Sequence, residues 1–198
     1  FGLGKVYFRQ GEFLKALEYH FKCLDLEKSV YGENHPYVAA SYNNIGLIYS
    51  EQGESMKALE CQLKCLDIYK SLNHPHVATS YNNVGSLYFS QGEYNKALEY
   101  YLKSLDLRKS AHGEDHPHVA AFYNNIGSVY AEQLEYVKAL EYNMKSLDIR
   151  KSIHGENHPH TAVSYDSVAL IYFLLEDCVK ASEYYLKALE IYKSVYEE

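Results

Sequence analysis

The sequence has no tryptophan and only four prolines among its 198 residues, and it lacks any apolar run long enough to cross a bilayer. No secretory signal stands at its start, and because it begins with Phe1 rather than Met we expect a segment of a longer protein. Lys and Arg form no cluster, and the formal net charge is −7. These absences exclude a membrane span and argue against a nucleic-acid partner, since phosphate binding requires clustered cations.

Motifs that carry out chemistry are also missing. There is no Gly-x-Ser-x-Gly, no phosphate-binding loop and no His-Glu-x-x-His, so we expect neither enzyme activity nor a cofactor. The four cysteines include no Cys-x-x-Cys pair. Cys23 and Cys65 stand where other copies of a repeat carry Ser or Ala. This pattern favours small buried side chains in a reducing, cytoplasmic compartment over disulfides.

Histidine is comparatively abundant, with ten residues. A His-Pro-His tripeptide occurs at 74–76, 116–118 and 158–160. Zinc requires ligands that converge in a tetrahedron, whereas these histidines recur once per repeat in loops and helix starts. We interpret them as a copied loop and cap motif, and we expect no metal site.

Internal repetition is the strongest feature of the sequence. His-Pro occurs at 35–36, 74–75, 116–117 and 158–159, so successive copies are 39, 42 and 42 residues apart. A Gln-Gly-Glu turn recurs in register and weakens in the last two copies, around Leu134 and Glu176. The short interval reflects three residues missing from a loop, where a deletion is tolerated. We predict a single array with a truncated repeat at 1–34 and repeats at 35–73, 74–115, 116–157 and 158–198.

Each repeat predicts two antiparallel helices. In the second copy, Pro36 suits the first helical turn, which places His35 near the N-cap. Gly53 supplies the turn, so the first helix is expected over about 36–52 and the second over about 55–72.

Small residues recur at one register inside these helices. Glycine costs about 1 kcal/mol relative to alanine within a helix, so its recurrence needs a reason, and close approach of a neighbouring helix provides one. One hairpin cannot bury its apolar stripe alone, and we therefore expect stacked hairpins in an all-α solenoid. The small residues are Gly4, Gly46, Gly85, Gly127 and Ala169 in first helices and Ala16, Ala58, Ala97, Ala139 and Ala181 in second helices.

The order of Tyr, aliphatic-Gly, Tyr and Ala, with a small residue late in the second helix, resembles the tetratricopeptide repeat over essentially the whole chain. The period of 42 residues and the Gly-Glu-Asn/Asp-His-Pro segment resemble the repeats of kinesin light chains and nephrocystin-3. The resemblance implies a right-handed superhelix whose first helices line a concave groove for an extended peptide or helix of a protein partner. It implies a protein-binding scaffold or adaptor without enzyme activity.

The face of the first helices opposite the packing stripe is the predicted groove. One Asn recurs there per hairpin, and an amide both donates and accepts hydrogen bonds, which suits the backbone of an extended peptide. Alternatively, these Asn residues simply suit a solvated helix face. The predicted groove residues are Asn43, Leu47, Asn82, Ser86, Phe89, Asn124, Ser128, Asp166, Leu170 and Phe173.

Neighbouring Asn residues suggest a different role. Asn44, Asn83 and Asn125 lie closer to the junction between repeats, and we expect them to form structural hydrogen bonds to adjacent backbone. Cations on the groove are limited to Lys5 and Arg9 of the truncated repeat, so we expect no binding of an acidic, chaperone-type tail.

Two other functions remain open at this point. The array could serve as a structural spacer or assembly surface, because apolar surface at its ends would favour end-to-end self-association. It could also act as an intramolecular regulatory arm of a larger protein.

Overall fold

The structure is a computed structural model in which residues 2–196 are described and form ten helices and no strand. The helices are α1 (Gly2–Arg9), α2 (Phe13–Tyr31), α3 (Pro36–Glu51), α4 (Ser55–Ser71), α5 (Val77–Ser90), α6 (Tyr94–His112), α7 (Pro117–Glu132), α8 (Tyr136–His154), α9 (Pro159–Leu174) and α10 (Cys178–Tyr196). The bounds of α3 and α4 confirm the two helices predicted for that copy. In this described part of the chain, no helix is long and apolar enough to cross a membrane.

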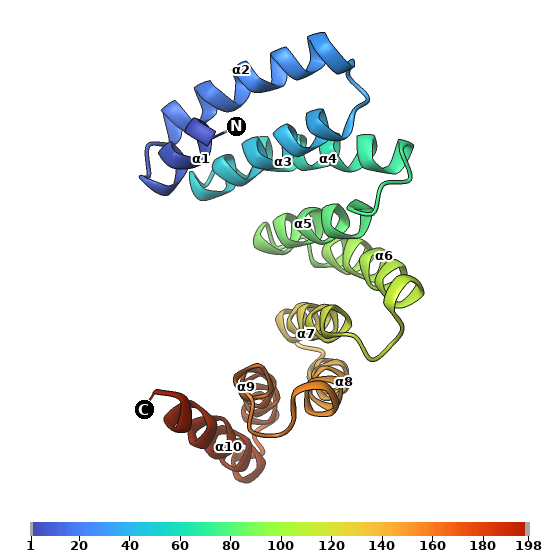
Figure 1. The fold of residues 1–198 in the computed structure, drawn as a ribbon. Helices are drawn as coiled ribbons and strands as arrows, with labels where there is room; N and C mark the ends of the chain where they lie inside the picture. Colours follow the sequence, from blue (N-terminus) through green and yellow to red (C-terminus); the bar gives the residue numbers. More distant parts are fainter. Residues whose placement is uncertain (1, 197–198) are drawn as a thin grey trace. The chain divides into compact units, whose positions relative to one another are not determined.

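Consecutive helices form antiparallel hairpins (Figure 1). The chain reverses at Gly11, Gly53 and Gly92, each with a φ near +75°, a left-handed conformation that glycine adopts without steric cost. Leu134 and Glu176 take the same positions with a φ of 63°. The turn therefore forms in these two copies without glycine. Both residues adopt a left-handed backbone conformation, which is unfavourable for any residue with a Cβ atom.

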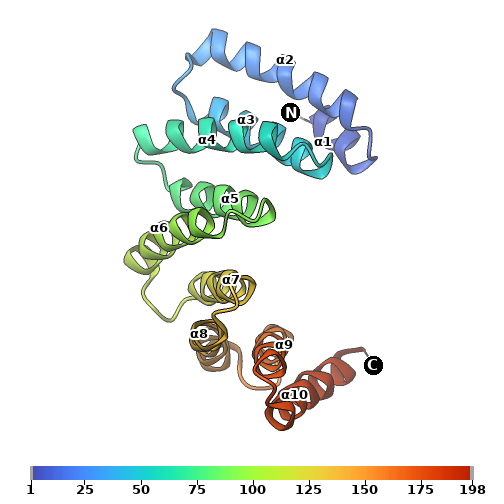
Figure 2. The ribbon, with the colours of Figure 1, turned by 180° about the vertical axis from the view of Figure 1, so that it is seen from behind.

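Contacts divide the chain into two compact units, Phe1–Tyr100 and Tyr101–Glu198. In the first unit, α3 packs against α2 and α4, and α4 packs against α5. In the second, α9 packs against α8 and α10, and it also touches α7 (Figure 2). Helices α3 and α9 are therefore each packed against second helices on two sides. Their exposed residues, such as Leu47 and Leu170, mark the side that no helix covers.

Histidine caps begin three of the first helices. In α3, α7 and α9 the cap residue is extended, Pro follows it, and its Nδ1 accepts a hydrogen bond from the backbone N–H two residues on. The cap predicted for His35 is thus confirmed. Helix α5 differs, because it begins at Val77 rather than at Pro75. Its loop is three residues shorter, yet His74 keeps the histidine contact of the other copies, because its Nδ1 accepts a hydrogen bond from the backbone N–H of His76 at 3.2 Å.

The helical glycines lie at close helix contacts, as the sequence predicted. A Cβ on Gly46 would fall 3.2 Å from Cγ of Gln62 and 3.3 Å from the carbonyl oxygen of Ala58. A Cβ on Gly127 would fall 3.2 Å from the carbonyl oxygen of Ala139. The small residues of first and second helices therefore face each other within a hairpin, and Ala58 and Ala139 are fully buried.

Candidate partner-binding face

The first-helix face is the uncovered side of α3 and α5 in one unit and of α7 and α9 in the other, and it carries the predicted groove residues. In the first unit, Leu47 and Ser86 are exposed, while Asn43, Asn82 and Phe89 are half-buried. In the second unit, Leu170 and Phe173 are exposed and Asn124, Ser128 and Asp166 are half-buried.

Asn43 is tied into a network that the sequence did not reveal. Its side-chain oxygen accepts hydrogen bonds from Gln62 Nε2 at 3.3 Å and from Asn83 Nδ2 at 3.0 Å. Gln62 Nε2 also lies 3.2 Å from the Asn43 backbone oxygen. Because the Asn43 amide oxygen already joins α4 and α5 to α3, its NH₂ group is the part left to meet a ligand.

Asn83 forms a structural hydrogen bond, as predicted, but its partner is a side chain and not the backbone. Asn83 makes a structural hydrogen bond between neighbouring repeats, yet it donates to the side chain of Asn43 rather than to backbone. Sequence reasoning missed Gln62, although a signal existed. It stands four residues after Ala58, a position where other copies carry His20, Tyr101 or Tyr185. A buried polar residue in that place indicates a specific partner.

The corresponding groups of the second unit are arranged differently. Ser128 Oγ donates to the backbone oxygen of Asn124 at 3.1 Å, within its own helix. Asn143, the counterpart of Gln62, donates from Nδ2 to the backbone oxygen of Ser167 at 3.3 Å. Asp166 replaces the recurring Asn, and one of its carboxylate oxygens accepts a hydrogen bond from the Tyr192 hydroxyl at 2.9 Å. A carboxylate is therefore held in place on this part of the face.

Helix α9 exposes a stripe of large apolar side chains. Leu170 is 47% exposed and Phe173 58% exposed, whereas Val168 and Ile171 of the same helix are at most 1% exposed. Val163 and Leu174 extend the stripe along the same side and are also exposed. One side of α9 thus closes the core, and the other presents a second apolar surface to solvent.

Stacked rings surround the histidine caps. His154 lies over His158, with ring centroids 4.5 Å apart and planes at 18°, and Tyr31 lies over His35 with the same separation and angle. Partial desolvation lowers the pKa of His154, and His158, His160 and Arg150 lower it further. Over residues 2–196, no group of three or more His, Cys, Asp or Glu side chains is arranged to hold a metal ion. The histidine rings stack on one another, and Nδ1 of each cap histidine accepts a hydrogen bond from a backbone N–H of the first helical turn.

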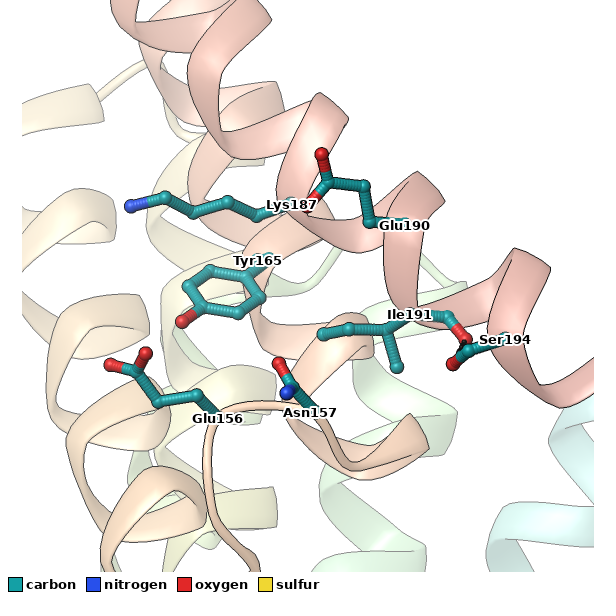
Figure 3. Close-up of a pocket in the computed structure, with 7 residues that line it drawn as sticks. All are labelled: Glu156, Asn157, Tyr165, Lys187, Glu190, Ile191 and Ser194. Atoms are coloured by element: carbon teal, nitrogen blue, oxygen red, sulfur yellow. Dashed lines mark hydrogen bonds between the residues drawn. The ribbon is translucent and has the colours of Figure 1, made fainter.

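A small hollow recurs at the junctions between repeats. In the second unit it measures about 390 Å³ and lies between α9, α10 and the loop before α9 (Figure 3). Lys151 and Lys187 lie over the Tyr165 ring at 5.9 and 5.8 Å from its centroid, and Lys151 pairs with Glu156 at 2.7 Å. The hollow is lined by Glu156, Asn157, Tyr165, Lys187, Glu190, Ile191 and Ser194.

The first unit repeats this arrangement around Tyr42. The hollow there measures about 360 Å³, and Lys28 and Lys64 lie 5.4 and 5.5 Å from the Tyr42 centroid. In both units one lysine pairs with a carboxylate of the loop that follows its helix, Lys28 with Glu33 at 3.5 Å and Lys151 with Glu156 at 2.7 Å, so positive and negative charges lie together. The hydrogen bond and charge of Lys151 lower the pKa of Glu156, as expected for such a pair. These hollows lie at the junctions between adjacent repeats. Each is lined by both lysines and carboxylates, so neither presents a surface of a single charge to a ligand.

The family model described as tetratricopeptide repeat matches residues 1–71, 76–152 and 118–194. A Podosopora anserina protein described as a kinesin light chain with nearly identical TPR-like repeats is 18% identical, with 100% of this chain and 95% of that chain covered and a TM-score of 0.86. No curated protein sequence matches the chain closely enough to count as a relative.

Two further structures share the fold. BtubC (BKLC) from P. vanneervenii is 23% identical, with 98% of this chain and 78% of that chain covered and a TM-score of 0.88. The apo form of RapI is 21% identical, with 95% and 51% covered and a TM-score of 0.81. These similarities confirm the predicted fold class, an all-α solenoid of antiparallel helix-turn-helix repeats.

Proposed function

The chain belongs to the tetratricopeptide repeat family, with repeats like those of kinesin light chains, and we propose that its first-helix face binds an extended peptide or a helix of a partner protein. The family and fold support a protein–protein interaction scaffold in general terms. The proposal adds the place of binding and the kind of ligand. It makes the chain a non-catalytic adaptor module.

The apolar stripe on α9 is the observation that carries the proposal. Leu170 and Phe173 each expose about half of a large apolar side chain, although the core-facing side of α9 is already complete. Exposed apolar area that lies together on one helix face favours association with a partner that removes it from water. Single exposed apolar residues require no such explanation, but a stripe does.

Affinity capture from a lysate, followed by mass spectrometry, tests the proposal. The bait is compared with a Leu170→Ser/Phe173→Ser variant, whose changed residues are exposed and leave the core intact. A Val179→Ser variant is the matched control, because Val179 is 72% exposed on α10. We expect the double variant to lose partners that the control retains. Equal capture by all three baits would place binding elsewhere.

A second candidate function is assembly through α10. Tyr185 is 40% exposed and Leu189 45% exposed, whereas their counterparts Asn143 and Leu147 on α8 are 3% and 2% exposed beneath α9. The same helix side that receives a first helix inside the array is thus uncovered on α10, which would suit end-to-end self-association. Light scattering over a concentration series tests this. Association that persists in a Leu189→Glu variant would rule out this face.

A cytoplasmic location is part of the proposal. All four cysteines are free, and burial raises the pKa of the Cys65 thiol to about 11, which makes it unreactive. Free thiols are typical of a reducing compartment. Alkylation of protein taken from its native source, without reductant, should label every exposed thiol. A disulfide found there would contradict this location.

A further inference from the structure

We propose that a hollow between α2 and the start of α3 binds an arginine side chain of a partner protein. The site goes beyond the proposed function, because none of the predicted groove residues lines it. It lies within the first unit, where α2 packs against α3. The shape of the hollow, a carboxylate in its wall and a set of exchanged residues at this junction all favour a cation.

The hollow measures about 320 Å³ and is mostly apolar. Leu26, Val30, Tyr31 and Tyr37 line it, and each is at least half exposed. The rings of Tyr31 and Tyr37 meet edge to face with centroids 5.3 Å apart, and Tyr31 also stacks on His35 at 4.5 Å. These contacts hold the two tyrosine rings in place, and the face of a tyrosine ring attracts a cation.

Glu27 supplies the only charge among the described residues that line this hollow. It is 8% exposed, and one of its oxygens accepts a hydrogen bond from Ser41 Oγ at 2.7 Å. It forms no ion pair with any residue in the described range 2–196. A carboxylate accepts several hydrogen bonds, and burying its charge is costly without a cation. The carboxylate therefore has room for a charged donor that enters through the hollow.

The charged and titratable groups beside this carboxylate are engaged elsewhere. Lys28 pairs with Glu33 at 3.5 Å, and both line the other hollow of this unit. Nδ1 of His35 accepts a hydrogen bond from the Tyr37 backbone N–H at 3.2 Å, so that imidazole is uncharged in this arrangement. Helix α3 contains no Lys or Arg.

The cations of α1 lie along a different part of α2. A Cβ on Gly4 would fall against the ring of His20, which stands about 10 Å before Glu27 along the helix. Because α1 and α2 are antiparallel, Lys5 and Arg9 follow Gly4 in the direction away from Glu27.

Three residues of this junction differ together from those of the second unit. Glu27 stands where α6 and α8 carry Arg, and Tyr31 and Tyr37 stand where the other two junctions carry His. The counterparts are Arg108 and Arg150, His112 and His154, and His118 and His160. A carboxylate and two aromatic rings thus replace one cation and two imidazoles. Each exchange makes the junction more favourable for a cation supplied from outside.

The junction of α8 and α9 shows that a guanidinium fits this register. Arg150 donates to Ser164 Oγ and to the backbone oxygen of His160, each at 3.0 Å. In the first unit the corresponding hydroxyl, that of Ser41, donates to Glu27 instead. An acceptor therefore stands where the second unit has a donor. A guanidinium suits it better than an ammonium, because it stacks on tyrosine rings and is more weakly hydrated.

Three short fluorescent peptides test the inference by anisotropy. They share one sequence with Leu on either side of a central position, which holds Arg, Lys or citrulline. Citrulline has the shape of arginine without its charge. We expect the wild-type chain to bind the Arg peptide at least about tenfold more tightly than the citrulline peptide, because hydrogen bonds between charged groups are the stronger ones. The Lys peptide should lie between them.

Variants of α2 assign the effect to the carboxylate. Glu27→Gln should lower the affinity for the Arg peptide to that for the citrulline peptide, while Ser41 can still donate to the amide oxygen. Glu27→Arg introduces the residue that α6 and α8 carry, and it should abolish the preference for Arg. The matched control is Glu18→Gln, which removes the same charge from an exposed carboxylate that pairs with Lys22 at 2.6 Å. It should change neither affinity.

Several outcomes would overturn the proposal. They are equal binding of the Arg and citrulline peptides, binding of neither, and a preference for Arg that persists in both Glu27 variants. Self-association that Glu27→Gln abolishes in light scattering would identify a second copy of the chain as the occupant. Loss of Arg-peptide binding in the protein purified from its native source would identify an adjoining segment as the occupant. Either result would exclude a separate partner.

The same peptides keep this inference distinct from the proposed function. Leu170→Ser/Phe173→Ser changes the first-helix face and should bind the Arg peptide as the wild type does. Weaker binding by that variant would place the peptide on the first-helix face and would overturn the hollow as its site. Failure of the hollow leaves the capture experiment on the first-helix face unaffected.

Discussion

Gly127 on α7 lies directly against Asn143 on α8. A Cβ built on Gly127 would fall 2.9 Å from Cγ of Asn143 and closer still to its Oδ1, and 3.2 Å from the backbone oxygen of Ala139. Asn143 is 3% exposed and Ala139 is fully buried. Neither can move away without disturbing the interior of the hairpin, so the contact requires a residue without a side chain.

We predict that Gly127→Ala destabilises the chain. In an exposed helix this change would stabilise by about 1 kcal/mol, but overpacking of an interior costs about 1–3 kcal/mol, and the second effect is the larger. Urea unfolding followed by circular dichroism measures the difference. In a double-mutant cycle, Asn143→Ala should recover part of the loss, because it removes the nearest obstructing atoms. Increased stability of Gly127→Ala would show that the contact is loose.

We predict that Leu134→Gly stabilises the turn between α7 and α8. Leu134 has a φ of 63° and is 71% exposed, so the change relieves backbone strain and loses little burial. The gain should be about 0.5–1 kcal/mol, because the relieved strain of about 1–2 kcal/mol exceeds the entropic cost of glycine, and it is measured as a higher urea midpoint. Glu176→Gly should act likewise, while Leu134→Ala should gain nothing, because alanine has the same strain. A gain from Leu134→Ala would point to the exposed leucine itself.

We predict that stability of the α8–α9 junction falls as the pH drops through the range just below 6.5. The pKa of folded His154 lies below its ordinary value, so the unfolded chain binds more protons in that range and is favoured by acid. Unfolding midpoints at about pH 7.5 and about pH 5.5 measure the loss.

The variant His154→Tyr serves as the control for that experiment. Tyr31 already occupies the corresponding place over His35, with the same ring separation and angle. Tyrosine keeps the stack but does not titrate in this range, so the acid-induced loss should become smaller. The same pH dependence in the variant and the wild type would assign it to other groups.

We predict that Arg150→Met costs about 2 kcal/mol. The Arg150 guanidinium donates to the backbone oxygen of His160 and to Ser164 Oγ, each at 3.0 Å, and so joins α8 to α9. A hydrogen bond from a charged group contributes about 1.5–3 kcal/mol, and methionine retains the packing of the stem. Arg150→Lys should lose less. A thermal midpoint unchanged by Arg150→Met would mean that water replaces both bonds.

Local features of the fold were predictable from the sequence because they depend on short-range geometry. Pro36 and His35 mark a helix start wherever they occur, and Gly53 permits a left-handed turn regardless of what surrounds it. The recurrence of glycine at 46 and 127 identified the close helix contacts, because only neighbouring atoms explain its cost. The start of α5 at Val77 was not predicted from the sequence. The shortened loop changes the path of the backbone into the helix, and no local pattern of residues indicates that change.

The candidate site was predictable in position and not in detail. Helical spacing placed Asn43 and Phe173 on the uncovered side of their helices, because that spacing is a property of one helix alone. Which atoms of Asn43 remain for a ligand depends on Gln62 and Asn83, which are 19 and 40 residues away in sequence. The Tyr192–Asp166 hydrogen bond likewise spans 26 residues.

The sequence by itself determined the helices, their pairing into repeats and the side of each first helix that faces away from the core. These follow from spacing and from backbone preferences, which act over a few residues. Only the tertiary structure decided which polar groups bond to one another, which charges are offset and which apolar side chains stay uncovered. Those depend on how one helix is rotated against the next, and no short-range pattern specifies that rotation.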